Sequence, residues 1–256
     1  MKLNLRSTLP LLIVMALFYS ACKKTENKPA SSPHNDEVSA AIAKNLVQSL
    51  SGAYGGASIK DGVAPSAAIT ASSAKLKTQS EIGCGFFIDN SLDLKFNQGD
   101  TLKSETVGSV NYFFLCNNQR TTGYNLYDSL STTGKGPGYE FFFALVQDFK
   151  VRGLNVDNSN FTLNGRLKSY VDFSYTKKET SSSVHNIFHF IDAQVHAADN
   201  YDIVDGSATF ESIGESSTGA WDYSGTIKFL GNHKAKLTFM SKVYLIDLLT
   251  GSVTPA

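Results

Sequence analysis

Residues 161–247 alternate between apolar and polar side chains over five successive runs, and this alternation constrains the fold more than any other feature. Successive side chains of a β-strand point to opposite faces, so a period of two indicates strands with one buried face. The three clearest apolar rows are Phe161, Leu163, Gly165, Leu167, Val171, Phe173 and Tyr175; Trp221, Tyr223, Gly225, Ile227 and Phe229; and Ala235, Leu237, Phe239, Val243 and Leu245. Short polar turns separate the runs, which predicts an antiparallel sheet.

A second alternating region predicts a long hairpin between residues 82 and 116. Its apolar row consists of Ile82, Cys84, Phe86, Ile88, Leu92, Leu94 and Phe96, followed by Leu102, Val110, Tyr112, Phe114 and Cys116. The Asn-Gln-Gly-Asp sequence at 97–100 is a turn signal between the two halves. Gly134–Gly138 resembles a phosphate-binding loop only superficially. Since a Pro interrupts it and β-favouring residues follow, we interpret it as another hairpin turn.

Together these runs predict one all-β domain, a long-stranded antiparallel up-and-down meander of eight or nine strands. Gly165, Gly206 and Gly225 lie in apolar rows, where glycine permits a bend or a close approach. We therefore expect a strongly curled sheet that forms a barrel or half-barrel, with a β-sandwich as the alternative. Tyr139–Val146 is apolar on both faces, which predicts a strand that is covered on both sides.

One amphipathic helix precedes the sheet. Asp36 is a suitable N-cap and Gly52 a suitable C-terminal glycine, and the apolar stripe between them is expected to pack on the sheet. The predicted organisation is a signal peptide at 1–21, a flexible tether at 22–36, the helix at 37–51, a Gly/Ala/Ser-rich linker at 52–80, the β domain at 81–250 and a tail at 251–256.

The N-terminus has the features of a lipoprotein signal peptide. Lys2 and Arg6 precede an apolar stretch from Leu9 to Tyr19, and Ser-Ala-Cys follows with its cysteine at Cys22. This order of basic, apolar and small residues is typical of a secretory leader, and the apolar stretch is short for a membrane-spanning helix. An ordinary leader with a chance cysteine is the alternative.

The Ser-Ala-Cys sequence resembles a bacterial lipobox, and the whole arrangement resembles uncharacterised outer-membrane lipoproteins of the Bacteroidota. The resemblance covers the first 24 residues or so, and the Ser-Leu-Ser-Gly-Ala-Tyr-Gly-Gly stretch at 49–56 is similar too. It implies that Cys22 is lipidated and that Lys23 after it directs the protein to the outer membrane. We therefore expect a lipid-anchored protein of the outer membrane.

Secretion also bears on the two remaining cysteines, because disulfides form outside the cytosol. Cys84 and Cys116 both lie in the apolar row of the predicted hairpin. They face each other if the numbers of paired residues sum to 200, which centres the turn on Asp100. This agrees with the turn signal at 97–100, and we predict a Cys84–Cys116 disulfide, with two buried free thiols as the alternative.

The charge balance gives no support for nucleic-acid binding. The chain of 256 residues has 23 basic and 23 acidic residues. Removing Lys2 and Arg6 with the leader leaves 21 basic against 23 acidic residues, and no basic cluster is present.

Candidates for metal binding and catalysis are weak. His185 and His189 share a strand face and His196 lies nearby, but no cysteine or carboxylate joins them at ligand spacing, so we expect no metal and no cofactor. A glycosidase would need two carboxylates facing across a cleft. The available ones, which lie mostly in outward rows or near turns, are Glu140, Asp148, Asp172, Asp192 and Glu211.

The inward rows are rich in aromatic residues, which pack a core or, in a curled sheet, line an apolar cavity. The candidates for a ligand site are Phe210, Trp221, Tyr223, Phe229 and Phe239. We expect a non-enzymatic envelope protein that binds an apolar or glycan ligand or an envelope partner. Two alternatives remain open: a polysaccharide hydrolase that uses a carboxylate pair, and a structural surface lipoprotein with a packed core.

Overall fold

The structure is a computed structural model that describes residues 35–59, 87–118, 120–154, 160–176 and 180–256. Residues 32–256 form one compact unit. The predicted signal peptide, the lipidation site Cys22, residues 22–34 of the predicted tether and most of the predicted linker lie outside the described residues, and so does Cys84. Asn35 and Asp36, expected to end the tether, already belong to the helix, so Asp36 lies inside its first turn and is not the N-cap.

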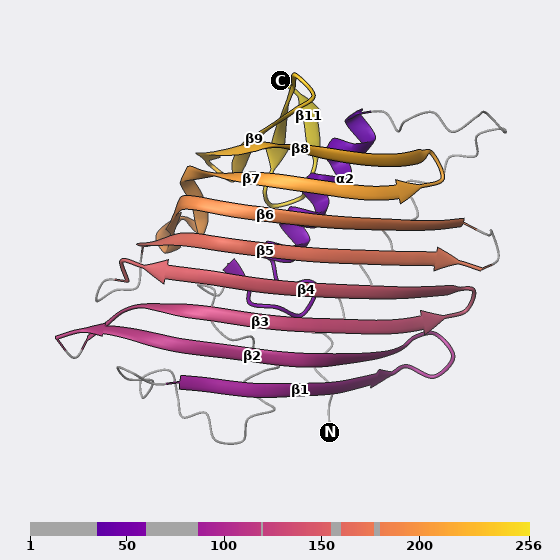
Figure 1. Ribbon diagram of the computed structural model, residues 1–256, viewed down its shortest axis with the longest axis horizontal. Coiled ribbons are helices and arrows are strands. Elements are labelled where there is room, and N and C mark those ends of the chain that lie inside the picture. Colours follow the sequence, from indigo (N-terminus) through magenta and orange to yellow (C-terminus); the bar gives the residue numbers. More distant parts are fainter. Residues whose placement is uncertain (1–34, 60–86, 119, 155–159, 177–179) are drawn as a thin grey trace. The chain divides into compact units, whose positions relative to one another are not determined.

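Eleven antiparallel strands form a single sheet in which every strand lies beside its neighbours in sequence (Figure 1). The strands are β1 (Phe87–Asn97), β2 (Lys103–Asn117), β3 (Arg120–Gly136), β4 (Tyr139–Arg152), β5 (Asn160–Tyr175), β6 (Thr180–His196), β7 (Asp202–Ser216), β8 (Gly219–Gly231), β9 (Lys234–Phe239), β10 (Lys242–Asp247) and β11 (Val253–Pro255). A short 3-10 helix, η4 (Ala197–Asp199), joins β6 to β7.

The predicted all-β up-and-down meander with one N-terminal helix is confirmed. The sheet does not close, since β1 and β11 are its two edges, and the described strands form one sheet rather than the two of a sandwich. There are more strands than the eight or nine expected. Met240 and Ser241 make a turn that divides one predicted run into β9 and β10, and β11 occupies residues expected to be a tail.

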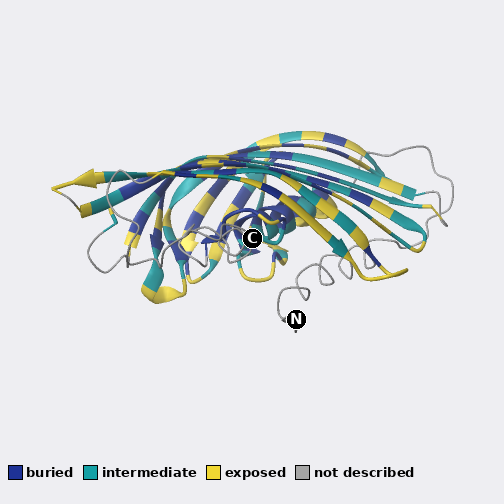
Figure 2. Cartoon of the chain, turned by 90° about the horizontal axis from the view of Figure 1, so that it is seen from below, coloured by how far each residue is buried: buried dark blue, intermediate teal, exposed yellow. Residues whose placement is uncertain are grey.

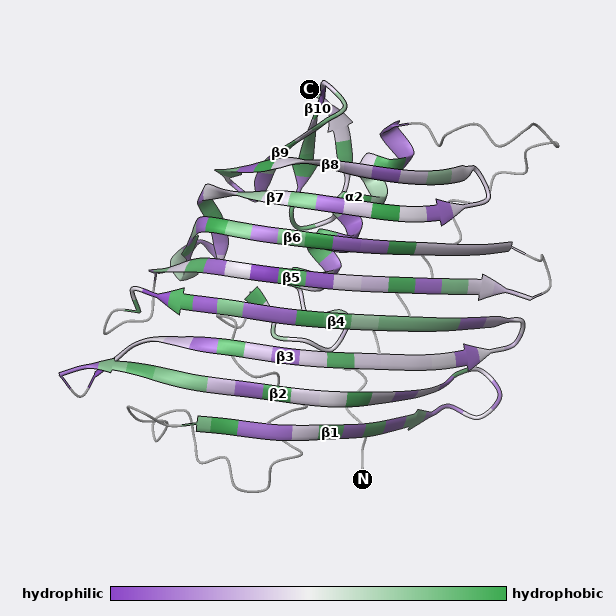
Figure 3. Cartoon of the chain, in the orientation of Figure 1, coloured by the Kyte–Doolittle hydropathy of each residue, from purple (hydrophilic) through white to green (hydrophobic). Residues whose placement is uncertain are grey.

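The alternation that predicted the strands appears as alternating bands of hydropathy along them (Figure 3). The β1–β2 hairpin has the predicted register: Ile88 pairs with Tyr112, so the numbers of paired residues sum to 200. The predicted hairpin turn at the Gly134–Gly138 stretch joins β3 to β4.

Glycines occur where neighbouring strands approach closely. A Cβ built on Gly165 would lie 2.1 Å from the Asp148 carbonyl oxygen, and one on Gly206 would lie 2.4 Å from that of Asp192. The pairing of β5 with β6 shifts register beside Gly165, and that of β6 with β7 shifts after Ile191. Bulges of this kind bend a strand and increase its twist, which explains the curl of the sheet (Figure 2).

Helix α2 (Asn35–Leu50) lies in the concave side of the curled sheet (Figure 2). Its buried apolar residues are Val38, Ile42, Ala43, Leu46 and Leu50. Polar contacts fix it to β10 and to the central strand β5: the Tyr244 hydroxyl donates to Asp36 Oδ1 at 2.9 Å, and the Ser169 hydroxyl donates to Asn45 Oδ1. The helix thus covers the apolar inner row, as its stripe predicted.

Residues 52–59, expected to belong to a linker, continue from the end of α2 across the inner face of β3 and β4. Tyr54 is buried, and its ring centroid lies 5.2 Å from that of Phe143. This layer covers only the inner face of β4. Phe142 and Val146 on the outer face are half-buried, shielded by neighbouring strands, so the prediction that β4 is covered on both sides is wrong for the described residues.

Candidate functional site

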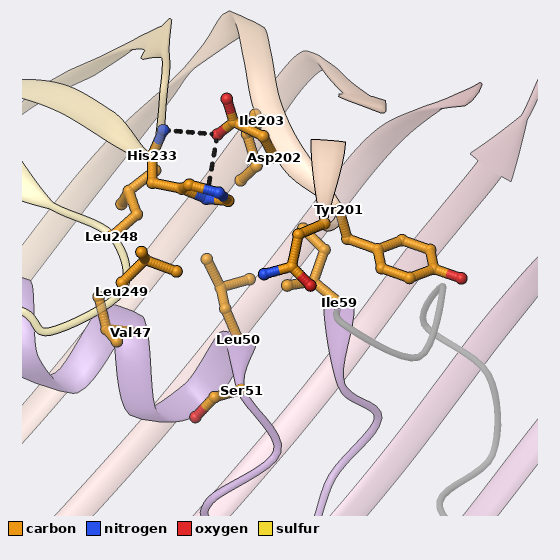
Figure 4. A pocket seen from close by; sticks show the side chains of 11 residues that line it. Val47, Leu50, Ser51, Ile59, Tyr201, Asp202, Ile203, His233, Leu248 and Leu249 are labelled. Atoms are coloured by element: carbon orange, nitrogen blue, oxygen red, sulfur yellow. Dashed lines mark hydrogen bonds and ion pairs between the residues drawn. The ribbon is translucent and has the colours of Figure 1, made fainter. Parts of the chain in front are cut away.

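A pocket lies at one end of the sheet, where four segments distant in sequence converge (Figure 4). The C-terminal end of α2 contributes Leu50 and Ser51 to one wall, and the start of β7 contributes Asp202 and Ile203 to the opposite one. The turns after β8 and β10 complete it. No single stretch of the sequence contains this site, and only the curl of the sheet around α2 creates it.

The walls of the pocket are mainly aliphatic. Leu50, Ile59 and Ile203 are buried, whereas Leu249 is 46% exposed at the rim. The enclosed space between the walls is about 40 Å³. This is room for a few water-sized groups and far below the volume of a typical ligand pocket, so the site can take the end of a chain rather than a whole ligand.

Asp202 and His233 form the polar wall. The Asp202 carboxylate is almost completely buried, and its Oδ1 accepts a hydrogen bond of 2.9 Å from the backbone N–H of His233. The same oxygen lies 3.4 Å from His233 Nδ1. Asn232 and His233 have φ angles of 53° and 52°, the left-handed pair of a tight hairpin turn. Asp202 therefore holds this turn and orients its imidazole.

The pocket contains a serine, a histidine and an aspartate but does not assemble them as a catalytic triad. The Ser51 hydroxyl donates to the Gln48 carbonyl oxygen at 3.1 Å, within the last turn of the helix. Figure 4 shows Ser51 on the opposite side of the pocket from His233. A triad requires the nucleophile within hydrogen-bond reach of the histidine. Ser51, His233 and Asp202 therefore do not form a triad in this pocket.

A second buried polar cluster lies under residues 51–59 and is enclosed. Ala57 N–H donates to Gln147 Oε1 at 2.7 Å, and Gln147 Nε2 donates back to the Ala57 carbonyl oxygen at 3.1 Å. Asp128 Oδ1 accepts from the Gln147 backbone N–H at 2.9 Å. Burial raises the pKa of Asp128 to about 7, although backbone N–H groups of Ala57 and Gln147 oppose the shift. This cluster ties the segment to the sheet.

The five aromatic residues predicted for a ligand site lie on the inner face of β7, β8 and β9, where they pack with other core aromatics. The ring centroid of Phe239 lies 6.1 Å from that of Phe210 and 5.5 Å from that of Tyr223. Phe229 stacks on Phe190, and Trp221 Nε1 donates to the Ser212 hydroxyl at 3.0 Å. None of the five lines the pocket at the end of α2.

The residues weighed for metal binding and hydrolysis do not converge on a cleft, although Glu140 and Asp172 are diagonal neighbours on the outer face of β4 and β5. His185 and His189 lie on the outer face of β6, and His196 contacts Asp199 at 3.4 Å. The described residues contain no group of three or more potential metal ligands. The five carboxylates, Glu140, Asp148, Asp172, Asp192 and Glu211, are exposed or half-exposed. Cys116, the described member of the predicted disulfide, lies at the exposed end of β2.

Sequence reasoning missed the two buried carboxylates. Asp128 interrupts the inward row of β3 between Leu126 and Leu130, and a carboxylate in an apolar row is a signal that could have been noticed. Asp202 stands at the first position of its strand, where alternation assigns no face, so the pattern carried no such signal.

Comparisons with models of known protein families, with curated proteins and with solved structures found no match. Within the described part of the chain, no helix is long and apolar enough to cross a membrane.

Proposed function

We propose that this protein is a lipid-anchored binding protein of the cell envelope that takes an apolar group into the pocket at the end of α2. The observation that carries the proposal is the convergence of aliphatic walls on the buried Asp202 and the half-buried His233, at a rim that stays open. Small-molecule sites typically combine such walls with a few polar groups that orient the ligand.

An apolar group fits this pocket better than a glycan does. Sugars stack on aromatic faces, and Tyr201 and His233 are the rings in the wall, whereas six of its residues are aliphatic. The Asp202 carboxylate favours a ligand that donates hydrogen bonds or carries positive charge, and it repels a carboxylate. The preferred ligand class is therefore a short alkyl chain that ends in an amine or hydroxyl.

The size of the pocket limits the affinity. Burying three or four methylene groups contributes about 3 kcal/mol, at ~0.8 kcal/mol each, which corresponds to a Kd of several millimolar. A free short chain therefore binds weakly. We infer that the pocket binds an apolar group that belongs to a larger envelope partner or ligand. The other contacts of that partner or ligand add to the affinity.

Saturation-transfer difference NMR tests the pocket with three probes that share one tail: hexylamine, hexanol and hexanoate. The protein is the mature chain with Cys22→Ala, which carries no lipid. We expect signals from the terminal methyl protons, strongest for hexylamine and weakest for hexanoate. Leu249→Trp should abolish them by filling the rim of the pocket.

Leu245→Trp is the matched control, because Leu245 is similarly exposed at 37% but does not line the pocket. Equal signals in both tryptophan variants, or no signal in the parent chain, would reject the pocket as the binding site. The alternative role as a structural surface lipoprotein would then be favoured, since the inner face of the sheet is already packed.

The anchoring part of the proposal rests on the N-terminal sequence, with Cys22 as the lipidated residue and the outer membrane as the destination. We also propose a disulfide between Cys84 and Cys116. The β1–β2 register supports it, because continuing the pairing beyond Phe87 and Phe113 sets residue 84 opposite residue 116.

A further inference from the structure

Strand β1 forms an open edge of the sheet. All 11 of its residues pair with β2 in one uninterrupted register, and its other side has no strand partner among the described residues. The strand contains no proline, glycine or bulge. The opposite edge differs, because β11 is only three residues long and includes Pro255. One edge is thus blunted while the other is long and regular.

A long regular edge presents unpaired backbone N–H and C=O groups, which make it a template for another strand. The side chains of β1 would continue the sheet on both faces. Ile88 and Leu92 of its inner row are buried, while Leu94 is 38% exposed at the edge. The outer row carries three exposed charges, on Asp89, Asp93 and Lys95, and Lys95 Nζ already lies 3.0 Å from Glu105 Oε1 of β2.

We propose that β1 pairs with β1 of a second copy of this chain, antiparallel about a two-fold axis that passes beside Leu92. In an antiparallel pairing, the two residue numbers of every opposed pair add up to the same sum. A two-fold axis makes the pairing reciprocal, so that if residue i faces residue j of the copy, residue j faces residue i. That sum must be even, because an odd sum would set inner residues opposite outer residues of the copy. Each allowed register is therefore centred on one residue of β1.

The charges of the outer row select the centre. With the centre on Leu92, Asp89 of each copy faces Lys95 of the other, and all 11 residues of the strand find a partner. Centring on Ser91 sets Asp89 against Asp93, and centring on Asp93 sets Asp93 against itself. Like charges directly opposite each other on a sheet are destabilising.

Two shorter registers pair seven residues without setting like charges opposite each other, and both are weaker. Centring on Asn90 leaves only residues 87–93 paired and excludes Lys95. Centring on Leu94 pairs Asp93 with Lys95 but overlaps only over residues 91–97. The Leu92 register also matches the inner row, where Ile88 faces Phe96 and Leu92 faces its own copy. Charge, length and apolar contact therefore favour the same register.

A cysteine scan of the inner row tests both the association and its register. Residues directly opposite in an antiparallel pair have Cα atoms about 4.5–5.5 Å apart, within the range of a disulfide. In the mature Cys22→Ala chain, Leu92→Cys should form covalent dimers under mild oxidation, seen on non-reducing gels. Asn90→Cys and Leu94→Cys should not, because each faces a different residue of the copy.

Charge reversal provides a second measurement. Sedimentation equilibrium of the same chain should show a dimer, and Asp89→Lys or Lys95→Glu alone should weaken it about ten-fold through two lost ion pairs. The double variant Asp89→Lys/Lys95→Glu should restore the association, which a general loss of folding cannot do. Thermal melts of each variant confirm that it is folded.

A chain that stays monomeric at 100 µM, or that cross-links through position 90 or 94 in place of 92, overturns the proposal. The result is independent of the pocket at the end of α2, which lies away from β1. Ligand binding there can fail while the dimer forms, and the converse also holds.

Discussion

Asp128 makes the stability of the protein depend on pH. Burial raises its pKa from 3.8 to about 7, so between these values the folded chain holds a proton that the unfolded chain has released. The free energy of unfolding therefore falls as pH rises through this window and levels off above it. The slope is up to about 1.4 kcal/mol per pH unit, a few kcal/mol in all.

Asp128→Asn should remove this slope, because the amide does not titrate. Urea unfolding of the parent and the variant at pH 4.5, 5.5, 6.5 and 7.5 measures the difference. Asp148→Asn serves as the control, since Asp148 is exposed on the neighbouring strand β4. If the free energy of unfolding changes with pH in the same way in the parent chain and in Asp128→Asn, the burial of Asp128 does not shift its pKa.

Close packing around Gly56 explains why this position of the stretch at 49–56 is a glycine. A Cβ on Gly56 would lie 2.3 Å from Leu145 Cδ2 and 2.6 Å from Gln147 Oε1. Gly56→Ala should therefore cost about 1–3 kcal/mol of stability through overpacking. In a Leu145→Ala background the penalty should shrink, since the clashing methyl group is gone. A double-mutant cycle by urea unfolding that gives no coupling would contradict this account.

At the scale of elements, the β1–β2 hairpin is the element for which the disulfide is proposed. Its observed register, with Phe87 opposite Phe113, is the one that sets Cys84 opposite Cys116 when continued. We expect mass spectrometry of the non-reduced mature chain to find one linked pair. The link should stabilise the chain by about 3–4 kcal/mol in the loop-entropy model, so Cys84→Ser should lower the urea midpoint. Alkylation of both cysteine thiols in the native, non-reduced chain would exclude the Cys84–Cys116 disulfide.

At the scale of the whole molecule, the proposed attachment to the membrane predicts a dependence on Cys22. Stable anchoring needs two or more lipid chains, as a lipidated N-terminal cysteine provides. Cys22→Ala should leave the protein soluble or unprocessed, as measured by cell fractionation and by incorporation of labelled palmitate. If the variant partitions with membranes like the parent, another part of the chain binds the membrane.

The strands, their order and one helix could be predicted from the sequence because they depend on local information. Alternation identifies a half-buried strand within a few residues, and a short turn leaves an antiparallel neighbour as the natural partner. The register of the β1–β2 hairpin follows in the same way, because the turn at 97–100 and the apolar row of Ile88 and Tyr112 agree on one pairing.

The tertiary structure decided what fills the curled sheet and where it stays open. Ala57 meets Asp128 and Gln147 across separations of 71 and 90 residues, and Asp202 meets His233 across 31. Such contacts require the sheet to curve around α2, as the bulges beside Gly165 and Ile191 allow. Periodicity records which face of a strand is buried but not what buries it, because the covering segment is chosen by the packing free energy of distant residues.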